Sequence, residues 1–223
     1  MKLAVFDFDR TLFPKDTIPY LIKQWYKLDY PKSKIVKVYV RLLPAYIVYK
    51  LGIGSKKTNI KLRNKAVEGF DEIFKGMSKN EIENFFYKTS ENLNNELNKD
   101  IVAKVIEAQK KGMHTVIISG AYEPLLQIIG KSLNIDTVIG TKLPYDANEV
   151  YNYKQKLTLI EGDKKVDELE KYFIQDIDWQ NSWFYTDSIR DIKLLELVGN
   201  PVAVNPDSHL LNHAKDNNWV IIG

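Results

Sequence analysis

The stretch that most constrains the fold is the N-terminal run Leu3–Thr11, in which apolar residues lead directly into two aspartates, Asp7 and Asp9. Strand side chains alternate between faces, so these aspartates can aim at one spot only where the strand ends and a loop begins. An apolar strand flanked by helical segments is typical of a buried parallel sheet, whose ligands bind beyond the carboxyl ends of the strands. The pattern therefore predicts a site at the exit of the first strand, with an ordinary acidic turn as the alternative.

Length and composition narrow the class of protein. The chain of 223 residues is long enough for one core with a subdomain, or for two small domains. It contains no cysteine, which excludes disulfides, thiolate chemistry and cysteine-ligated zinc and is compatible with a reducing cytoplasm. Asp7 and Asp9 interrupt the apolar run that a signal peptide needs, and no stretch reaches the ~20 apolar residues of a membrane span. We therefore expect a cytoplasmic globular protein.

Positive charge is concentrated in residues 15–65. This segment contains thirteen Lys or Arg residues and two acids, so its net charge is +11 in a chain whose total is +3. Such a block predicts either a surface that faces anions or an ordinary solvated helical face. Aromatic residues lie among the lysines, where they more often pack a small helical subdomain than stack nucleobases or lie at a lipid interface. They are Tyr20, Trp25, Tyr26, Tyr30, Tyr39, Tyr46 and Tyr49.

Residues 16–97 have helical periodicity and no strand pattern, which predicts an all-helical cap inserted after the first strand. Ser78 stands three residues before Glu81 and predicts a capping box at the start of a helix. Ile35–Leu51 predicts an amphipathic helix. Its basic stripe comprises Lys34, Lys37 and Arg41, and its apolar side includes Val36, Tyr39 and Val40.

From residue 98 onward, short apolar strands alternate with helices, which is the signature of a parallel α/β sheet. We expect a strand at 115–118 that ends at Ser119, a loop or hairpin over 141–157, and a strand at 183–185. The chain is thus predicted to be an α/β protein with a Rossmann-like parallel sheet core flanked by helices. Residues 1–15 and 98–223 form the predicted α/β catalytic core, and residues 16–97 form the predicted helical cap.

Polar residues follow three of the predicted strands, and a pair of lysines opens a helix between the last two. Because the carboxyl ends of parallel strands meet at one edge, the carboxylates are expected to crowd and repel unless a cation lies between them. A hard divalent ion with oxygen ligands, Mg²⁺, resolves this conflict, and the lysine, hydroxyl and glycine amide complete an anion cradle. The edge therefore predicts phosphoryl chemistry. Its residues are Asp7, Asp9, Thr11, Ser119, Gly120, Lys164, Lys165, Asp187 and Asp191.

These residues resemble the motifs of the haloacid dehalogenase-like (HAD) hydrolases. Asp7-Phe8-Asp9-Arg10-Thr11 is similar to their first motif, Ser119-Gly120 to the second, Lys165 to the third, and Asp187-Ser188-Ile189-Arg190-Asp191 to the fourth. The insertion between the first and second motifs resembles the helical cap of the branch that includes phosphoserine phosphatase.

The resemblance implies a magnesium-dependent phosphomonoester hydrolase in which Asp7 attacks phosphorus and becomes an aspartyl-phosphate, while Asp9 acts as acid and base. It implies that Asp7, the main-chain carbonyl of Asp9 and Asp187 hold Mg²⁺, with Asp191 near or in the shell. The implied phosphate-binding residues are Ser119, Gly120, Lys165 and Thr11, of which Thr11 mainly orients the loop. The neighbouring Lys164 is the alternative to Lys165.

The expected substrate is a small phosphorylated metabolite, with a phosphoserine-like compound as one option. Arg10, Asp16, Arg41 and Arg63 are candidate substrate-binding residues. A phosphatase that acts on a lipid or nucleotide phosphate is an alternative, and so is an anion-, lipid- or nucleic-acid-binding protein with a vestigial pocket. Peripheral membrane contact through the basic cap also stays open, and no nucleic acid is expected to be obligatory. A receiver domain shares the chemistry but is far shorter than 223 residues.

Overall fold

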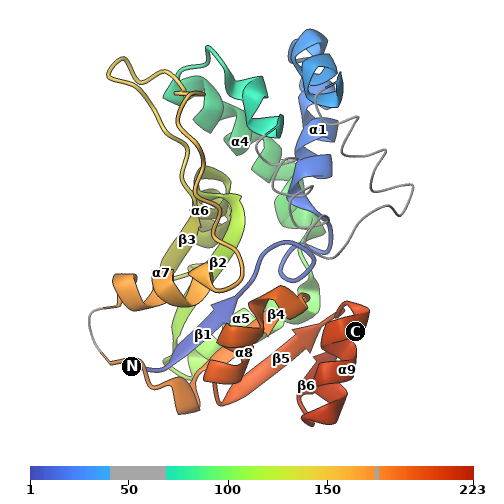
Figure 1. Cartoon of the computed structure of the whole chain (residues 1–223), viewed down its shortest axis with the longest axis vertical. Coiled ribbons are helices and arrows are strands. Elements are labelled where there is room, and N and C mark those ends of the chain that lie inside the picture. The colour runs from blue at the N-terminus through green and yellow to red at the C-terminus, as the bar shows by residue number, and fades with distance from the viewer. Residues whose placement is uncertain (41–68, 174–175) are drawn as a thin grey trace. The chain divides into compact units, whose positions relative to one another are not determined.

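The computed structural model describes residues 1–40, 69–173 and 176–223 (Figure 1). Its centre is a six-stranded sheet in which all neighbouring strands are parallel, in the order β3-β2-β1-β4-β5-β6. The predicted α/β class with a Rossmann-like parallel sheet is confirmed. The strands are β1 (Leu3–Phe6), β2 (His114–Tyr122), β3 (Thr137–Thr141), β4 (Trp183–Thr186), β5 (Asn200–Val204) and β6 (Val220–Ile222).

β1 lies inside the sheet between β2 and β4, and every residue from Leu3 to Phe6 is buried. Leu3 and Val5 share one core cluster with residues of α7 (Lys164–Tyr172), α8 (Ile192–Leu197) and α9 (Ser208–Asp216). The helices α5 (Lys99–Lys110) and α6 (Glu123–Ser132) contact β2, and α6 also contacts β3. The apolar run of β1 is therefore the middle of a layer covered by helices, as the sequence predicts.

The end of β2 differs from the predicted end at Ser119. The strand continues to Tyr122, and its pairing with β3 shifts register between Ile118 and Tyr122. The Thr141 hydroxyl donates to the carbonyl oxygen of Gly120 at 2.8 Å, which keeps the irregular part of the strand attached to β3. The shift takes Ser119 and Gly120 out of the regular ladder, so they lie in a bend and not in a loop.

The described part of residues 17–97 is helical and contributes no strand to the sheet. Its elements are α1 (Thr17–Lys27), helical residues 32–40, η1 (Asp71–Phe74), α4 (Lys79–Leu93) and η2 (Asn94–Glu96). The capping box of α4 is confirmed, because the Ser78 amide donates to Glu81 Oε2 at 2.8 Å and the Glu81 amide donates to Ser78 Oγ at 3.4 Å. Among the described helices, none is both long and apolar enough to cross a membrane.

The chain divides into two compact units. One comprises residues 1–16, 86–142 and 159–223, and the other comprises residues 17–85 and 143–158. The predicted hairpin belongs to the second unit: Asn152 N–H donates to the Pro144 carbonyl oxygen at 2.9 Å, and Tyr151 Oη donates to Asp71 at 2.6 Å. The sequence predicted a catalytic core of residues 1–15 and 98–223 and a cap of residues 16–97. These functional boundaries stay predictions, since the two compact units are defined by contacts alone.

Aromatic side chains form the core of the second unit. Trp25 is fully buried, and its ring contacts those of Tyr30 and Phe85 at centroid distances of 4.6 and 5.2 Å. Packing of a small subdomain, the more common role of such residues, is confirmed for Tyr20 and Trp25, which are both buried, and is wrong for Tyr26 and Tyr39, which are 39% and 52% exposed. Tyr46 and Tyr49 lie outside the described residues.

The predicted apolar side of the helix over 32–40 was wrong. Ile35 and Val38 are buried there, whereas Val36, Tyr39 and Val40 are 52–67% exposed. Helical periodicity shows that apolar residues share a face, but packing partners decide which of two apolar faces is covered. The rest of the predicted helix, including Arg41, lies outside the described residues.

Candidate active site

The exit of β1 is a tight turn that fixes Asp7 at the end of the central strand. The Asp7 amide donates to the Tyr185 carbonyl oxygen at 2.9 Å, so the sheet reaches this residue before the chain turns. Phe8 then accepts hydrogen bonds on its carbonyl oxygen from the amides of Thr11 and Phe13. Arg10 has φ of +58°, a left-handed conformation that favours glycine. The backbone is therefore strained at this position, because arginine carries a Cβ.

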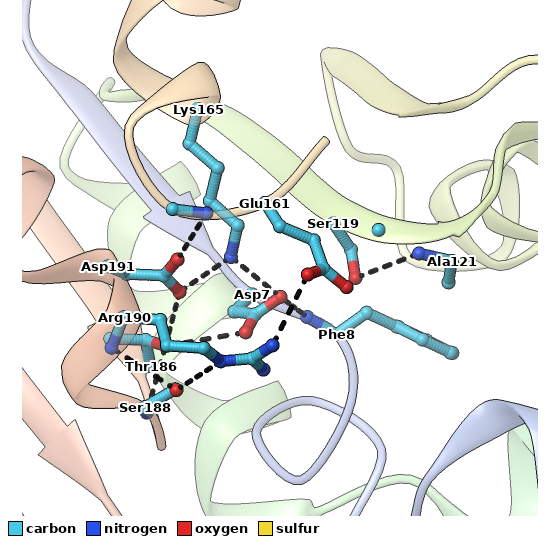
Figure 2. A network of polar contacts seen from close by, with 12 residues as sticks. Asp7, Phe8, Ser119, Ala121, Glu161, Lys165, Thr186, Ser188, Arg190 and Asp191 are labelled. Carbon is cyan, nitrogen blue, oxygen red and sulfur yellow. Dashed lines mark hydrogen bonds and ion pairs between the residues drawn. The ribbon is translucent and has the colours of Figure 1, made fainter. Parts of the chain in front are cut away.

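Asp7 and Asp191 share one buried lysine (Figure 2). Lys165 Nζ lies 3.0 Å from Asp7 Oδ1 and 2.7 Å from Asp191 Oδ2, and the lysine is 1% exposed. Although burial alone lowers the pKa of Lys165, the charges of Asp191 and Asp7 outweigh it and raise that pKa above its usual value. Lys165 is therefore an ammonium ion held between two carboxylates from different ends of the chain.

A threonine hydroxyl joins the same two carboxylates. Thr186, the last residue of β4, places Oγ1 2.9 Å from Asp191 Oδ2 and 3.3 Å from Asp7 Oδ2. The Phe8 amide donates to Asp7 Oδ1 at 2.8 Å. Both oxygens of Asp7 thus have hydrogen-bond donors, which fixes the orientation of its carboxylate.

Asp187 is the remaining buried carboxylate at this edge, with 8% of its surface exposed. Burial and the charge of Asp7 raise its pKa to about 8, while Arg10 and Lys165 compensate only in part. Its carbonyl oxygen accepts from the Asp207 amide at 3.0 Å, which ties the loop after β4 to the start of α9. Asp187 therefore lies at the site with an excess of negative charge around it.

Two of the predicted phosphate-binding residues, Ser119 and Gly120, come from β2, on the opposite side of β1 from β4. Ser119 is 2% exposed, and its Oγ accepts from the Ala121 amide at 3.3 Å. Gly120 follows at the bend of β2. Thr11 is fully buried, and its hydroxyl has no hydrogen-bond partner in the part of the chain that the structure describes.

The candidate substrate-binding residues are only partly described. Arg10 forms an exposed ion pair with Asp16, with Nη2 3.1 Å from Oδ2. Arg41 and Arg63 lie outside the described residues. Asp9 is half-buried in the turn after β1, where its backbone forms a bridge with Phe13.

Sequence reasoning missed three side chains of this network: Thr186, Glu161 and Arg190. Arg190 Nη1 lies 3.2 Å from Glu161 Oε2, and Arg190 Nε donates to Ser188 Oγ at 3.1 Å (Figure 2). In the sequence, only their positions could have pointed to Thr186 and Arg190, because each directly precedes a predicted site aspartate.

The donor set fits a hard divalent cation. Asp7 and Asp187 are both buried, and burial together with the charge of Asp7 disfavours ionisation of Asp187, a cost that a nearby cation removes. Among the described residues, no three His, Cys, Asp or Glu side chains are grouped as metal ligands. The set that the resemblance implies comprises two carboxylates and a main-chain carbonyl, with Asp191 near or in the shell. Both oxygens of Asp191 accept hydrogen bonds here, from Lys165, Thr186 and Gly162.

The fold and these residues correspond to a known family of hydrolytic enzymes. Residues 4–196 match the model of the haloacid dehalogenase-like hydrolases, so the chain belongs to this family. The predicted resemblance is confirmed.

Individual relatives give finer comparisons. A histidinol-phosphatase of Neisseria meningitidis is 32% identical over 120 residues, which are 51% of this chain and 53% of that protein, so the chain spans about half the length of this relative. A protein of unknown function from Bordetella pertussis has a solved structure with a TM-score of 0.79 at 20% identity, covering 100% of this chain and 98% of that one. A solved phospho-aspartyl intermediate analogue of phosphoserine phosphatase has a TM-score of 0.62 at 17% identity, covering 99% and 92% of the two chains. These structural likenesses show a shared fold.

Proposed function

We propose that this protein is a magnesium-dependent phosphomonoester hydrolase that acts through an aspartyl-phosphate on Asp7. The observation that carries the proposal is the environment of this carboxylate. Asp7 directly follows the central strand β1, is 7% exposed, and is oriented by the Phe8 amide and the Lys165 ammonium. An ionised carboxylate held in one orientation and screened from bulk water is suited to nucleophilic attack.

In the first step an oxygen of Asp7 attacks phosphorus, and the bond from phosphorus to the ester oxygen breaks. The leaving oxygen takes a proton from Asp9, which the turn after β1 holds two residues further on. The loose transition state spreads negative charge over the phosphoryl oxygens, and Lys165, the Ser119 hydroxyl and the Gly120 amide are the groups proposed to stabilise it.

In the second step a water molecule attacks the phosphorus of the aspartyl-phosphate and gives a proton to Asp9. The bond between phosphorus and the Asp7 oxygen breaks, orthophosphate leaves, and the carboxylate is restored. Thr186 and Lys165 hold the released carboxylate in its starting orientation. The acid and base roles of Asp9 alternate, so the enzyme returns to its initial protonation state after each turnover.

Asp7, the main-chain carbonyl of Asp9 and Asp187 are the groups proposed to hold Mg²⁺. When bound, this ion neutralises carboxylate charge and polarises a phosphoryl oxygen. The raised pKa of Asp187 supports the assignment, because it arises from burial and from the nearby charge of Asp7, and a cation bound there would offset both.

The proposed substrate is a small phosphorylated metabolite that carries an amine. Two relatives are named for phosphoserine and for histidinol phosphate, which are both amine-bearing phosphomonoesters. Asp16 supplies a carboxylate close to the β1 turn, where it now pairs with Arg10. We propose that the substrate amine competes with Arg10 for Asp16.

A second candidate is a phosphomonoester with a lipid body, reached by peripheral contact of the basic helical segment with a membrane. Val36, Tyr39 and Val40 are exposed on the helix over 32–40, which also carries lysines. Co-sedimentation with vesicles of anionic phospholipid tests this candidate. Loss of sedimentation in a Val36→Ser/Tyr39→Ser/Val40→Ser variant supports it, and sedimentation no different from that with neutral vesicles refutes it.

The main proposal is tested by hydrolysis of an aryl phosphate, followed by a screen of phosphoserine, histidinol phosphate, sugar phosphates, nucleotides and lipid phosphates. Turnover that needs Mg²⁺, that a chelator abolishes, and that Asp7→Asn eliminates without loss of fold supports the mechanism. Undiminished hydrolysis by Asp7→Asn rules it out.

A further inference from the structure

The Glu161–Arg190 ion pair lies beside the predicted phosphate-binding residues, and the proposed mechanism gives it no role. Arg190 Nη1 lies 3.2 Å from Glu161 Oε2, and the two side chains are 30% and 19% exposed. Figure 2 shows the guanidinium pointing toward the Glu161 carboxylate. A mostly buried ion pair at a site that must receive an anion calls for an explanation.

The carboxylate of Glu161 fills the space next to Gly120. A methyl group placed on Gly120 would lie 3.0 Å from Glu161 Cγ and 3.1 Å from Glu161 Oε1. The other carboxylate oxygen, Oε2, faces Arg190. An acidic side chain thus connects the Gly120 bend, whose amide is proposed to bind phosphate, with the guanidinium.

The backbone holds this arrangement in place. Gly162, directly after Glu161, donates its amide proton to Asp191 Oδ1 at 3.2 Å. It has φ of +55°, and an added Cβ there would lie 3.2 Å from the Arg190 carbonyl oxygen. Arg190 also donates from Nε to Ser188 Oγ at 3.1 Å. The segment before α7 and the loop after β4 are therefore fastened together, and the ion pair spans them.

The charges of Glu161 and Arg190 affect how an anion can bind at this site. Asp7, Asp187 and Asp191 are opposed near this edge by Lys165 and in part by Arg10, and Glu161, paired with Arg190, places a further carboxylate where an anionic phosphoryl group would have to enter. Arginine binds phosphate oxygens in the same fork geometry that it uses for a carboxylate. An incoming phosphoryl group can therefore take the place of the Glu161 carboxylate on the same guanidinium.

We propose that Glu161 and Arg190 form an anion switch: Glu161 occupies Arg190 in the substrate-free enzyme, and phosphoryl oxygens displace it and bind Arg190 beside Gly120. This inference rests on the proposed function and deepens it, because it adds Arg190 as a phosphate-binding residue and Glu161 as an internal competitor of the phosphoryl group. The switch acts on orthophosphate as product and on the phosphoryl group of any substrate.

Calorimetric titration with inorganic phosphate, in the presence of Mg²⁺, tests the switch on the full chain. Glu161→Gln keeps the shape of the side chain and removes its charge, so it is expected to bind phosphate about tenfold more tightly than wild type. Arg190→Gln is expected to bind about tenfold more weakly, and Arg190→Lys to recover part of the loss.

The double variant separates competition for Arg190 from simple repulsion. If Glu161 acts by occupying the guanidinium, Glu161→Gln gains about twofold or less when Arg190 is already glutamine, which is a non-additive result. Glu107→Gln is the matched control, because it removes the same charge from an exposed carboxylate paired with Lys104 and Lys111. It is expected to leave the phosphate affinity within about twofold of wild type.

Phosphate affinity in Glu161→Gln that equals or falls below that of wild type overturns the inference, provided that urea unfolding shows the variant to be folded. An undiminished gain in the double variant also overturns it. Aryl phosphate hydrolysis by wild type, tested in parallel with Asp7→Asn, reports on the proposed function separately. Normal turnover with no gain in Glu161→Gln defeats the switch alone, whereas absent turnover defeats the proposed function and leaves the phosphate titration to decide the switch.

Discussion

Thr186 offers the sharpest test of how the network around Asp7 works. Its hydroxyl lies 2.9 Å from Asp191 Oδ2 and 3.3 Å from Asp7 Oδ2, and it accepts from the Ser188 amide at 3.3 Å. Thr186→Val replaces the hydroxyl by a methyl group of nearly the same size. The perturbation therefore removes hydrogen bonds while the packing of β4 is kept.

The expected loss of stability follows from these contacts. A hydrogen bond to a charged group contributes about 1.5–3 kcal/mol, and Asp191 keeps its contacts with Lys165 and Gly162, which favours the lower half of that range. The Ser188 amide also loses its acceptor, which adds about 1 kcal/mol. Thr186→Val should therefore lower the free energy of unfolding by about 2.5–3 kcal/mol.

The catalytic effect should exceed what a loss of stability explains. Without the hydroxyl, Asp7 Oδ2 loses its donor and the carboxylate can rotate, so kcat for an aryl phosphate should fall about tenfold with KM nearly unchanged. Thr186→Ser, which keeps a hydroxyl, should restore most of the activity. Urea unfolding and steady-state kinetics on the same preparations measure both effects.

A second buried threonine supplies the control. Thr115 is fully buried near the start of β2, and its hydroxyl donates to Asp136 Oδ2 at 2.7 Å. Thr115→Val should therefore cost a similar free energy of unfolding and leave kcat unchanged. Equal kcat in Thr186→Val and Thr115→Val would refute the positioning role and leave Thr186 a purely structural residue.

Three further predictions concern charge and metal. Lys165→Met should lower the free energy of unfolding by about 3–5 kcal/mol in urea, because it leaves Asp7 and Asp191 buried without their cation; a loss below about 1 kcal/mol would contradict this. Burial raises the pKa of Asp136, but hydrogen bonds from Thr115 outweigh it and lower that pKa overall. The ionised Asp136 carboxylate therefore stabilises the fold above about pH 4, and this stabilisation is lost as the pH falls through the folded-state pKa. Asp136→Asn should therefore lose less stability than wild type on acidification, and parallel urea midpoints would count against this. Mg²⁺ at 100 times its Kd should raise the free energy of unfolding by about 2.7 kcal/mol in a thermal melt, and a chelator should reverse the shift; melting that ignores both would argue against the metal site.

Much of the fold was readable from local pattern. The run Leu3–Phe6 predicted a buried parallel strand because no polar residue interrupts it, and Ser78 with Glu81 predicted the start of α4 because a capping box needs only four consecutive residues. The end of β2 was misplaced because its continuation depends on Thr141 of the neighbouring strand, which no local pattern contains. The exposed face of the helix over 32–40 was misassigned for a related reason, since this helix contacts distant residues, as when Lys34 donates to the carbonyl oxygens of Ile73 and Lys75.

The residues of the candidate site likewise include some that the sequence predicted and some that it did not. Asp7, Lys165 and Asp191 were predicted from strand ends and motif order, and the structure brings them within hydrogen-bond distance. Thr186 and the pair of Glu161 with Arg190 were not predicted, because threonine, glutamate and arginine are common surface residues with no spacing rule of their own. Only the parallel pairing of β1 with β4 brings Thr186 close to Asp7.

The sequence alone determined the order of strands and helices, the family and the acidic residues of the site, because apolar periodicity and short motifs are local properties. Tertiary structure alone decided which charges meet. Lys165 touches Asp7 across more than 150 residues of chain, and Glu161 reaches both Arg190 and Gly120. The strength of such contacts depends on distance and burial, and neither is set until the sheet and its helices have packed.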